Sequence, residues 1–338
     1  MRYTSKNSIS ISIEFVRVLL SKVNLDEEII DDLLCTNRIP RHLLNEPDAR
    51  VSLIQYSQLM HELANLSQDE LLGHGNSALP FGSMSLLIHW MIGAKNLKQA
   101  ASRINRFFKV LGQGLGITSY SEDEVIFFEI DSPTRDKNSG VFIAELVFTN
   151  IHRLLSWLAL EIIPIDHVDF QWAAPEYAQD YRLMFYGAPV FFEQRNTRIG
   201  IPQTAFEKPV RQNLANLEKF LENPSFEILV LDFKADNMAS KVAAKIRETL
   251  DSIPALPELA KDLGIHPHTL QRNLAKEGTT YLAIKNQVKR DAAIDMLVNT
   301  DFSIEEISSR LGFSETSPFT RTFKEWTGIP PSAYRKYY

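Results

Sequence analysis

The sequence predicts two domains: an α+β domain over residues 1–222 and an all-α domain over residues 238–338 that contains two helix–turn–helix units. Residues 223–237 are predicted to link them. Three observations support this prediction. The chain of 338 residues exceeds one average domain. Helical and strand-like patterns are mixed before residue 222. One helix–turn–helix pattern occurs twice after residue 254.

The first third of the chain is predicted to be helical. Asp26, Glu27 and Glu28 place acidic side chains in the first turn of one helix, and Ser52 is a suitable N-cap for another. Pro40 and Pro47 interrupt the helical pattern between these two helices. Apolar residues recur at helical spacing over residues 9–22, 25–34, 52–66, 83–93 and 97–111.

Strands and helices alternate over the rest of the first domain. Three further helices are predicted at residues 140–163, 175–185 and 207–221, and Asn223-Pro224 ends the last of them. A mixture of this kind is typical of an α+β domain. Alternating or continuous apolar residues indicate strands at 115–120, 125–130, 168–172, 190–192 and 198–201.

The first helix–turn–helix copy begins at Leu256. Its first helix ends at Gly264, because glycine readily adopts the left-handed backbone conformation that stops a helix. A second helix follows over residues 266–276, with Leu270 and Leu274 on its buried face. The outward face of this second helix is left free.

The second copy repeats the pattern. A helix over residues 304–311 ends at Gly312, and Ser314 is predicted to be the N-cap of the next helix. Phe319 and Phe323 form its buried face. A helix held in this way can enter a DNA major groove by its N-terminal end.

A long helix, Tyr281 to Val298, is predicted to join the two copies. Leu282, Val288, Ala292 and Leu297 are expected to pack against both of them. One copy alone is explained equally well by an ordinary helical hairpin. Two copies on one rod favour binding to adjacent major grooves, which lie roughly 34 Å apart on one face of a duplex.

A set of residues over 254–338 resembles the DNA-binding domain of the AraC/XylS family of bacterial transcription regulators. The resemblance implies two helix–turn–helix units on one face of the duplex. The residues that carry it are Thr269-Leu-Gln-Arg272, Arg290, Ala293, Met296-Leu297, Ile304-Glu-Glu-Ile307, Leu311-Gly-Phe313, Phe319, Arg321, Phe323-Lys324, Trp326-Thr-Gly328, Pro330-Pro331 and Tyr334-Arg335.

The first domain is similar to the arabinose-binding-type sensor domain of one AraC branch, which includes regulators of the ornithine-utilisation type. The similarity covers roughly residues 15–210 and implies a ligand-responsive domain. It does not imply arabinose, because effectors differ across that branch. The matching segments are Ile39-Pro-Arg41, Glu46-Pro-Asp-Ala-Arg50, the helix pair between Gly82 and Phe108, and Tyr186-Gly-Ala-Pro-Val-Phe-Phe192.

The candidate DNA-binding residues lie on the outward faces of the two second helices. Arginine suits guanine and glutamine suits adenine in the major groove. His266 is expected to replace the usual serine cap. Asn273 stands where relatives often have a second arginine, and Pro318 offers no backbone donor. The candidates are His268, Thr269, Gln271, Arg272, Thr316, Ser317 and Arg321.

Polar side chains on aromatic-rich helices are the candidates for holding a small-molecule effector. An apolar pocket with a few polar anchors is typical of such sites. His152 and Arg153 on the long helix are further candidates, and a surface or capping role is the alternative for every one of these residues. The main candidates are His89, Trp90, Arg103 and Arg106.

The net charge of −6 is unevenly distributed. Residues 237–338 hold 14 Lys and Arg against 12 Asp and Glu, and the rest of the chain holds 22 against 30. The predicted DNA-binding part is therefore only mildly basic. Its affinity must depend on well-placed contacts and on two units acting together.

Composition places the chain among soluble globular proteins, with 44% hydrophobic and 23% charged residues. We expect no membrane span and no signal peptide, because neither apolar pattern is found. The single cysteine, Cys35, precludes an internal disulfide and a multi-cysteine metal site. A cytoplasmic protein without metal or other cofactor is predicted.

These observations predict a ligand-responsive, sequence-specific transcription regulator that binds double-stranded promoter DNA and a small molecule. No phosphate loop, acid pair or catalytic triad supports an enzyme. Two alternatives stay open: a constitutive regulator whose first domain only dimerises, and an enzyme with a DNA-binding tail. RNA polymerase and a second copy of the chain stay open as partners, and so does the choice between activator and repressor.

Overall fold

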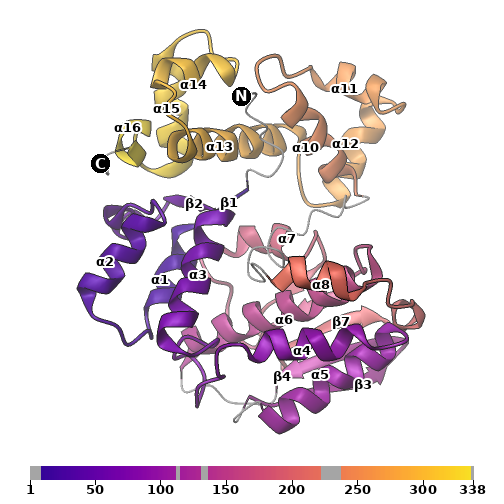
Figure 1. Ribbon diagram of the computed structural model, residues 1–338. Coiled ribbons are helices and arrows are strands. Elements are labelled where there is room, and N and C mark those ends of the chain that lie inside the picture. The colour runs from indigo at the N-terminus through magenta and orange to yellow at the C-terminus, as the bar shows by residue number, and fades with distance from the viewer. Residues whose placement is uncertain (1–8, 112–114, 131–135, 222–236, 336–338) are drawn as a thin grey trace. The chain divides into compact units, whose positions relative to one another are not determined.

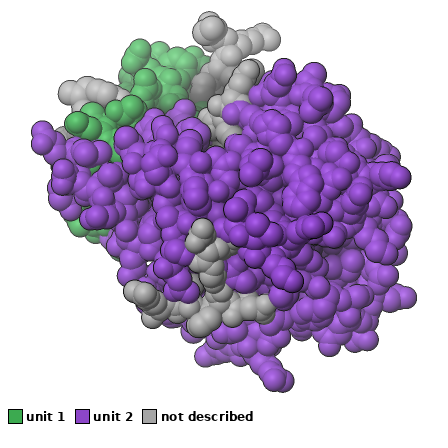
Figure 2. Space-filling model, turned by 60° about the horizontal axis from the view of Figure 1, so that its bottom comes forward, with its two compact units in different colours: residues 1–15, 30–56, 234–338 green, residues 16–29, 57–233 purple. Residues whose placement is uncertain are grey.

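The computed structural model describes residues 9–111, 115–130, 136–221 and 237–335 (Figure 1). Contacts divide the chain into two compact units (Figure 2). Unit 1 comprises residues 1–15, 30–56 and 234–338, and unit 2 comprises residues 16–29 and 57–233. The predicted domains, residues 1–222 and 238–338, are each one continuous segment of the chain, and their boundaries stay a prediction. The predicted linker, apart from Asn237, lies outside the described residues.

Unit 2 contains a five-stranded sheet of order β3-β4-β7-β5-β6. Strands β5 and β6 are parallel, and the other neighbours are antiparallel. Phe128 of β4, paired with Ile199 of β7, lies in the core. The strands are β3 (Ile117–Glu122), β4 (Val125–Ile130), β5 (His167–Asp169), β6 (Val190–Phe191) and β7 (Arg198–Pro202).

Helices and short 3₁₀ turns complete this unit, and α5 and α6 contact the sheet at β3 and β7 (Figure 1). Three further helices, α1 (Ile13–Leu20), α2 (Glu27–Thr36) and α3 (Leu53–Ser67), contribute residues to both units. The elements of unit 2 are α4 (Ser83–Ile92), α5 (Leu97–Leu111), α6 (Lys137–Ala159), η2 (Ala178–Asp180), α7 (Tyr181–Met184), η3 (Gln203–Glu207) and α8 (Leu214–Leu221).

Helix α6 is the central helix of unit 2. Asp136 caps it, because its carboxylate accepts a hydrogen bond from the Ser139 N–H at 2.9 Å. The helix is long and apolar enough to cross a membrane by length and composition alone, but 89% of that window is buried inside the protein. A core helix of a soluble protein meets the same criterion.

Unit 1 combines a short β-ribbon with seven helices among its described residues. The ribbon pairs β1 (Ser10–Ser12) with β2 (Arg50–Ser52) in antiparallel register, and η1 (Arg41–Asn45) precedes the second strand. The helices are α10 (Met238–Glu248), α11 (Leu256–Asp262), α12 (Pro267–Lys276), α13 (Tyr281–Asn299), α14 (Ile304–Arg310), α15 (Thr316–Thr327) and α16 (Pro331–Arg335).

Buried polar contacts attach the ribbon to the helices of unit 1. The Ser10 hydroxyl donates to Asp291 Oδ1 of α13 at 2.5 Å, and Arg50 Nε donates to the Ser10 hydroxyl at 3.0 Å. The Arg50 backbone N–H donates to the Tyr334 hydroxyl of α16 at 3.0 Å. Paired groups of this kind are needed because a buried unpaired polar group costs about 1–3 kcal/mol.

Several predicted elements differ from the structure in their bounds. The helix predicted from residue 9 starts at Ile13, because residues 10–12 form β1. The helix predicted over 207–221 starts only at Leu214, because the N–H groups of Val210 and Arg211 donate to the Lys95 and Leu158 carbonyls instead of to a helical turn. Ser52 ends β2, and its hydroxyl accepts from the Gln55 N–H at 3.2 Å, which confirms its predicted capping role.

Candidate nucleic-acid interface

The first helix–turn–helix unit is formed by α11 and α12, with α10 packed against α12. Leu259, Leu270 and Leu274 are buried in one apolar cluster with residues of α10 and α13. Gly264 has φ +69°, as the predicted helix stop requires. The carboxylate of Glu277 accepts from the N–H groups of Met238 and Ala239, at 2.8 Å each, and so joins the end of α12 to the start of α10.

His266 is the N-cap of α12. Its ring Nδ1 accepts a hydrogen bond from the His268 N–H at 3.3 Å, which confirms the expected substitution for serine. Pro267 occupies the first helical position, where no helical N–H is lost. His268, Gln271 and Arg272 of this helix are exposed, and Thr269 is half-buried.

The second helix–turn–helix unit is formed by α14 and α15. Ser303 and Glu306 form a capping box at the start of α14, with Ser303 N–H to Glu306 Oε2 at 2.7 Å and Glu306 N–H to Ser303 Oγ at 3.1 Å. Gly312 ends the helix with φ +70°. A Cβ atom there would lie 2.5 Å from the Asp251 carbonyl oxygen, so only glycine fits.

Helix α15 begins one residue later than predicted. Its N-cap is Glu315, without a side-chain cap bond, so the prediction of Ser314 as the cap is wrong. The buried face is as predicted: Phe319 and Phe323 are fully buried, and their ring centroids lie 5.7 Å apart. Phe313 of the turn lies 5.5 Å from Phe319, so the turn is anchored on the same core.

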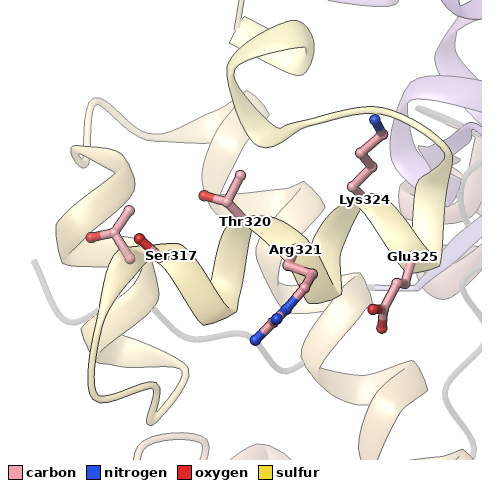
Figure 3. A pocket seen from close by; sticks show the side chains of 6 residues that line it. Ser317, Thr320, Arg321, Lys324 and Glu325 are labelled. Carbon is pink, nitrogen blue, oxygen red and sulfur yellow. The ribbon is translucent and has the colours of Figure 1, made fainter.

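The outward face of α15 lines an open surface hollow (Figure 3). Thr316, Ser317 and Arg321, predicted from the sequence, lie together there with Thr320, Lys324 and Glu325. The hollow therefore presents hydroxyl groups, two cations and one carboxylate along a single helical face. Hydroxyls, arginine and lysine are the side chains that contact phosphates and base edges.

Thr320, Lys324 and Glu325 were not among the predicted site residues. The spacing from Ser317 to Thr320 and on to Lys324 would have identified two of them, because residues three and four apart share a helical face. The N-caps give a second signal. Arg272 and Arg321 are both six residues after their N-caps, His266 and Glu315. Counted in the same way, Thr320 of α15 occupies the position that Gln271 occupies on α12.

The linking helix α13 runs between the two helix–turn–helix units (Figure 1). Val288, Ala292 and Leu297 are buried as predicted, but Leu282 is 63% exposed. The prediction that Leu282 packs in the core is wrong, because Ile284 of the same turn occupies the buried position. Lys289 lies 4.5 Å from the Phe313 ring centroid, and burial lowers the pKa of Lys289 to about 8.

The four main effector candidates lie on the outside of helices α4 and α5. Trp90 is 39% exposed, and His89 and Arg106 are exposed. Arg103 donates to the carbonyls of Trp90 and Gly93 and also lies over the Trp90 ring at 5.8 Å. This arrangement joins the two helices. The predicted effector-binding role of the four residues stays a prediction.

His152 and Arg153, the further candidates on the long helix, are buried within unit 2. His152 is 1% exposed and Arg153 is 7% exposed. Arg153 donates to the Tyr186 hydroxyl, and its guanidinium lies 4.2 Å from the centre of the Tyr186 ring. Sequence periodicity alone did not separate these two residues from the exposed set.

Two family models match the chain over separate segments. Residues 30–210 match the arabinose-binding domain of AraC transcription regulators, N-terminal, and residues 259–337 match a helix-turn-helix domain. The first match spans more than half of the chain. The chain belongs to the AraC family of transcription regulators. As a member, it is a DNA-binding regulator with an N-terminal ligand-binding domain.

Relatives of similar length support this assignment. The ornithine utilization regulator of Pseudomonas aeruginosa is 25% identical over 301 residues, covering 88% of each chain. A helix–turn–helix transcriptional regulator of Mycobacterium tuberculosis is 24% identical over 317 residues, covering 90% of each. Both relatives are named as transcription regulators. The expectation that this chain is not an enzyme stays a prediction.

Among solved structures, the transcriptional regulator CdpR of Pseudomonas aeruginosa aligns over 93% of this chain and 99% of its own. The identity is 20% and the TM-score is 0.34.

Proposed function

We propose that this regulator binds double-stranded promoter DNA through the outward faces of α12 and α15, each placed in a major groove. One observation carries the proposal: both helices bury one face in the core and expose polar and cationic side chains at matching positions on the other. Helix α13 packs in one apolar cluster with α11 and α12, and it contacts α14 of the second helix–turn–helix unit. This is the geometry that helix–turn–helix proteins use.

The proposed contacts follow from side-chain chemistry. Arg272 and Arg321 have the fork of donors that pairs with guanine, and Gln271 can pair with adenine. His268, Thr269, Thr316 and Ser317 lie nearer the helix N-termini, where recognition helices contact bases and phosphates.

Footprinting of the full chain on DNA upstream of its own gene tests this proposal. We expect two protected major-groove segments on one face of the duplex, one helical turn apart. The double variant Gln271→Ala/Arg272→Ala should lose protection of one segment before the other, and Ser317→Ala/Arg321→Ala the reverse. Lys245→Ala, on the exposed surface of α10, removes a charge outside the two helices and is the control.

Simultaneous loss of both segments at every protein concentration, in either double variant, would show that the two helices do not bind separately. Protection that survives both double variants would remove α12 and α15 from the interface altogether.

We also propose that the protein acts in the cytoplasm, forms homodimers and contacts RNA polymerase at the promoter. Family membership supports these partners. Light scattering of the free protein measures the dimer, and a monomer at all concentrations contradicts it. Transcription with purified polymerase, at promoters bound by the wild type and by Gln271→Ala/Arg272→Ala, measures the direction of regulation.

A further inference from the structure

The buried face of α15 packs against a ring of the last helix, α16. Phe323 of α15 is fully buried, and its ring centroid lies 5.2 Å from that of Tyr334, with the two rings edge to face at 84°. An aromatic pair in this geometry contributes about 0.5–1.5 kcal/mol beyond the area that it buries. The place of the Tyr334 ring therefore influences where α15 lies.

The hydroxyl group of Tyr334 joins α16 to the β-ribbon. It accepts a hydrogen bond from the backbone N–H of Arg50 in β2 at 3.0 Å, and both residues are 3% exposed. Removal of the hydroxyl would leave the Arg50 N–H buried without this partner, and an unpaired buried group is costly. The ribbon thus fixes the far side of the ring that packs on α15.

Arg50 is in turn fixed to the linking helix α13. Its guanidinium donates to the hydroxyl and to the carbonyl oxygen of Ser10, at 3.0 and 2.8 Å, and the Ser10 hydroxyl donates to Asp291 at 2.5 Å. Arg290 Nε lies 3.4 Å from the same oxygen of Asp291. A shift of either strand would leave these buried charges without partners, so the ribbon has one register on α13.

Two further contacts place the segment before β2 at the ends of helices. Gly328 is the C-cap of α15, and a Cβ atom there would lie 3.4 Å from Cβ of Asp48. The Arg38 guanidinium donates to the Val298 carbonyl near the end of α13 at 2.9 Å. Residues 38–50 therefore contact the ends of both α13 and α15.

The first helix–turn–helix unit is supported by a different element. Helix α10 packs with α11 and α12 in one apolar cluster, and Glu277 binds the start of α10. The ribbon is formed by residues 10–12 and 50–52, and its second strand lies within the segment 30–210 that matches the arabinose-binding domain. A strand of the matched sensor segment thus supports α15 through α16, whereas α10 supports α12.

We propose that the β-ribbon positions α15 for DNA binding and that Tyr334 is the positioning residue through which it acts. The proposal rests on the DNA-binding role of α15 given above. With the bond between Arg50 and Tyr334 formed, α15 is held in the orientation that places Arg321 in the groove. Without it, α15 adopts this orientation for only part of the time, and the affinity of that half of the interface falls by the same fraction.

Quantitative footprinting of the full chain with Tyr334→Phe tests the proposal, because this change keeps the ring on Phe323 and removes only the hydroxyl. We expect the affinity for the segment bound by α15 to fall by about two- to tenfold, which corresponds to the net value of one hydrogen bond. The affinity for the segment bound by α12 should stay the same. Ser10→Ala, which separates Arg50 from Asp291, should weaken the same segment as Tyr334→Phe.

Tyr281→Phe is the matched control. The Tyr281 hydroxyl donates to the Pro254 carbonyl beside the first helix–turn–helix unit, so its removal should leave the segment bound by α15 unchanged. Circular dichroism at the temperature of the titration shows whether each variant is folded. Tyr334→Phe decides the question if Ser10→Ala, which deprives the buried Asp291 carboxylate of a partner, does not fold.

A double-mutant cycle separates positioning from a general loss of stability. In an Arg321→Ala background the arginine contact of α15 is already lost, so Tyr334→Phe should weaken DNA binding little further. In an Arg272→Ala background it should weaken binding as much as in the wild type. Equal effects in the two backgrounds overturn the proposal and leave Tyr334 a role in the fold alone.

The wild-type footprint separates this proposal from the function on which it rests. If Ser317→Ala/Arg321→Ala protects the same DNA as the wild type, α15 does not bind DNA and the proposed function fails. If the wild type protects two segments and Tyr334→Phe protects both with unchanged affinity, DNA binding stands and the positioning by the ribbon fails.

Discussion

Arg272 and Arg321 occupy the same position on two different helices, six residues after the N-cap. Both side chains are exposed, whereas the residues two positions earlier, Leu270 and Phe319, are fully buried. The backbone is thus fixed on one side and the guanidinium is presented on the other. This arrangement favours base contacts, which require an arginine held in a defined register.

Arg272→Ala is expected to weaken specific binding by about 1–3 kcal/mol and to relax the preference at one base pair. Fluorescence anisotropy with a set of single base-pair substitutions measures both effects. Arg272→Lys is the matched comparison, because lysine keeps the charge but not the bidentate fork. Weaker binding with an unchanged sequence preference would identify Arg272 as a phosphate contact.

Glu145 gives the stability of unit 2 a definite pH dependence. Burial raises the pKa of Glu145 from 4.5 to about 8, so the folded chain keeps a proton that the unfolded chain releases. The stability contribution is complete below pH 4.5 and is lost as the pH rises through 8, by at most about 1.4 kcal/mol per unit.

In Glu145→Gln this loss is absent. Urea unfolding of both proteins at pH 5 and at pH 8.5 should therefore show the variant gaining stability relative to the wild type as the pH rises. An equal difference at both pH values contradicts the burial of an ionisable group at this position.

At the level of elements, periodicity identified the long helices and paired strands. The predicted bounds of α5 and β4 agree with the structure, and α13 differs by one residue. The strands β1 and β2 were missed because each has only three residues, too few for an alternating pattern. Their position depends on contacts with α13 and α16, which local sequence does not encode.

The two turn glycines provide a prediction for the helix–turn–helix elements. In Gly264→Ala the new Cβ has no heavy atom within 4 Å, so the only loss of stability comes from the left-handed backbone, about 1–2 kcal/mol. Ala at Gly312 must also displace the Asp251 carbonyl, 2.5 Å from the new Cβ. Gly312→Ala should therefore lower the stability more than Gly264→Ala. Chemical denaturation of the two variants measures this, and equal losses contradict the tight turn.

The site was predicted unevenly. Outward positions on α12 and α15 follow from helical spacing, so the sequence identified Arg272 and Arg321 without the structure. Thr320 was not identified, because its equivalence to Gln271 depends on the N-cap of α15, which is Glu315 and not the predicted Ser314.

At the level of the whole molecule, the charge balance limits how DNA is attracted. The chain carries −6 overall, and residues 237–338 carry 14 cations against 12 anions. A general positive field is therefore weak, and the salt dependence of binding reports on individual phosphate contacts.

Lys324→Ala should reduce the slope of log affinity against log salt by about 0.9 and leave the base preference unchanged. Titrations between about 50 and 200 mM salt measure the slope. Lys245→Ala, on α10, is the control. A changed base preference in Lys324→Ala would place Lys324 at a base edge.

The β-ribbon has a consequence for the order in which parts of the chain can pack during synthesis. The ribbon is complete once Ser52 has been synthesised, but Asp291, the partner of Ser10, follows 281 residues after Ser10. At about 5–20 residues per second, this delay is on the order of 15–55 s. Tyr334, which accepts from Arg50, comes later still. The earliest strands on the ribosome are thus among the last to be packed, and a chain interrupted before residue 291 leaves their polar groups for chaperones to shield.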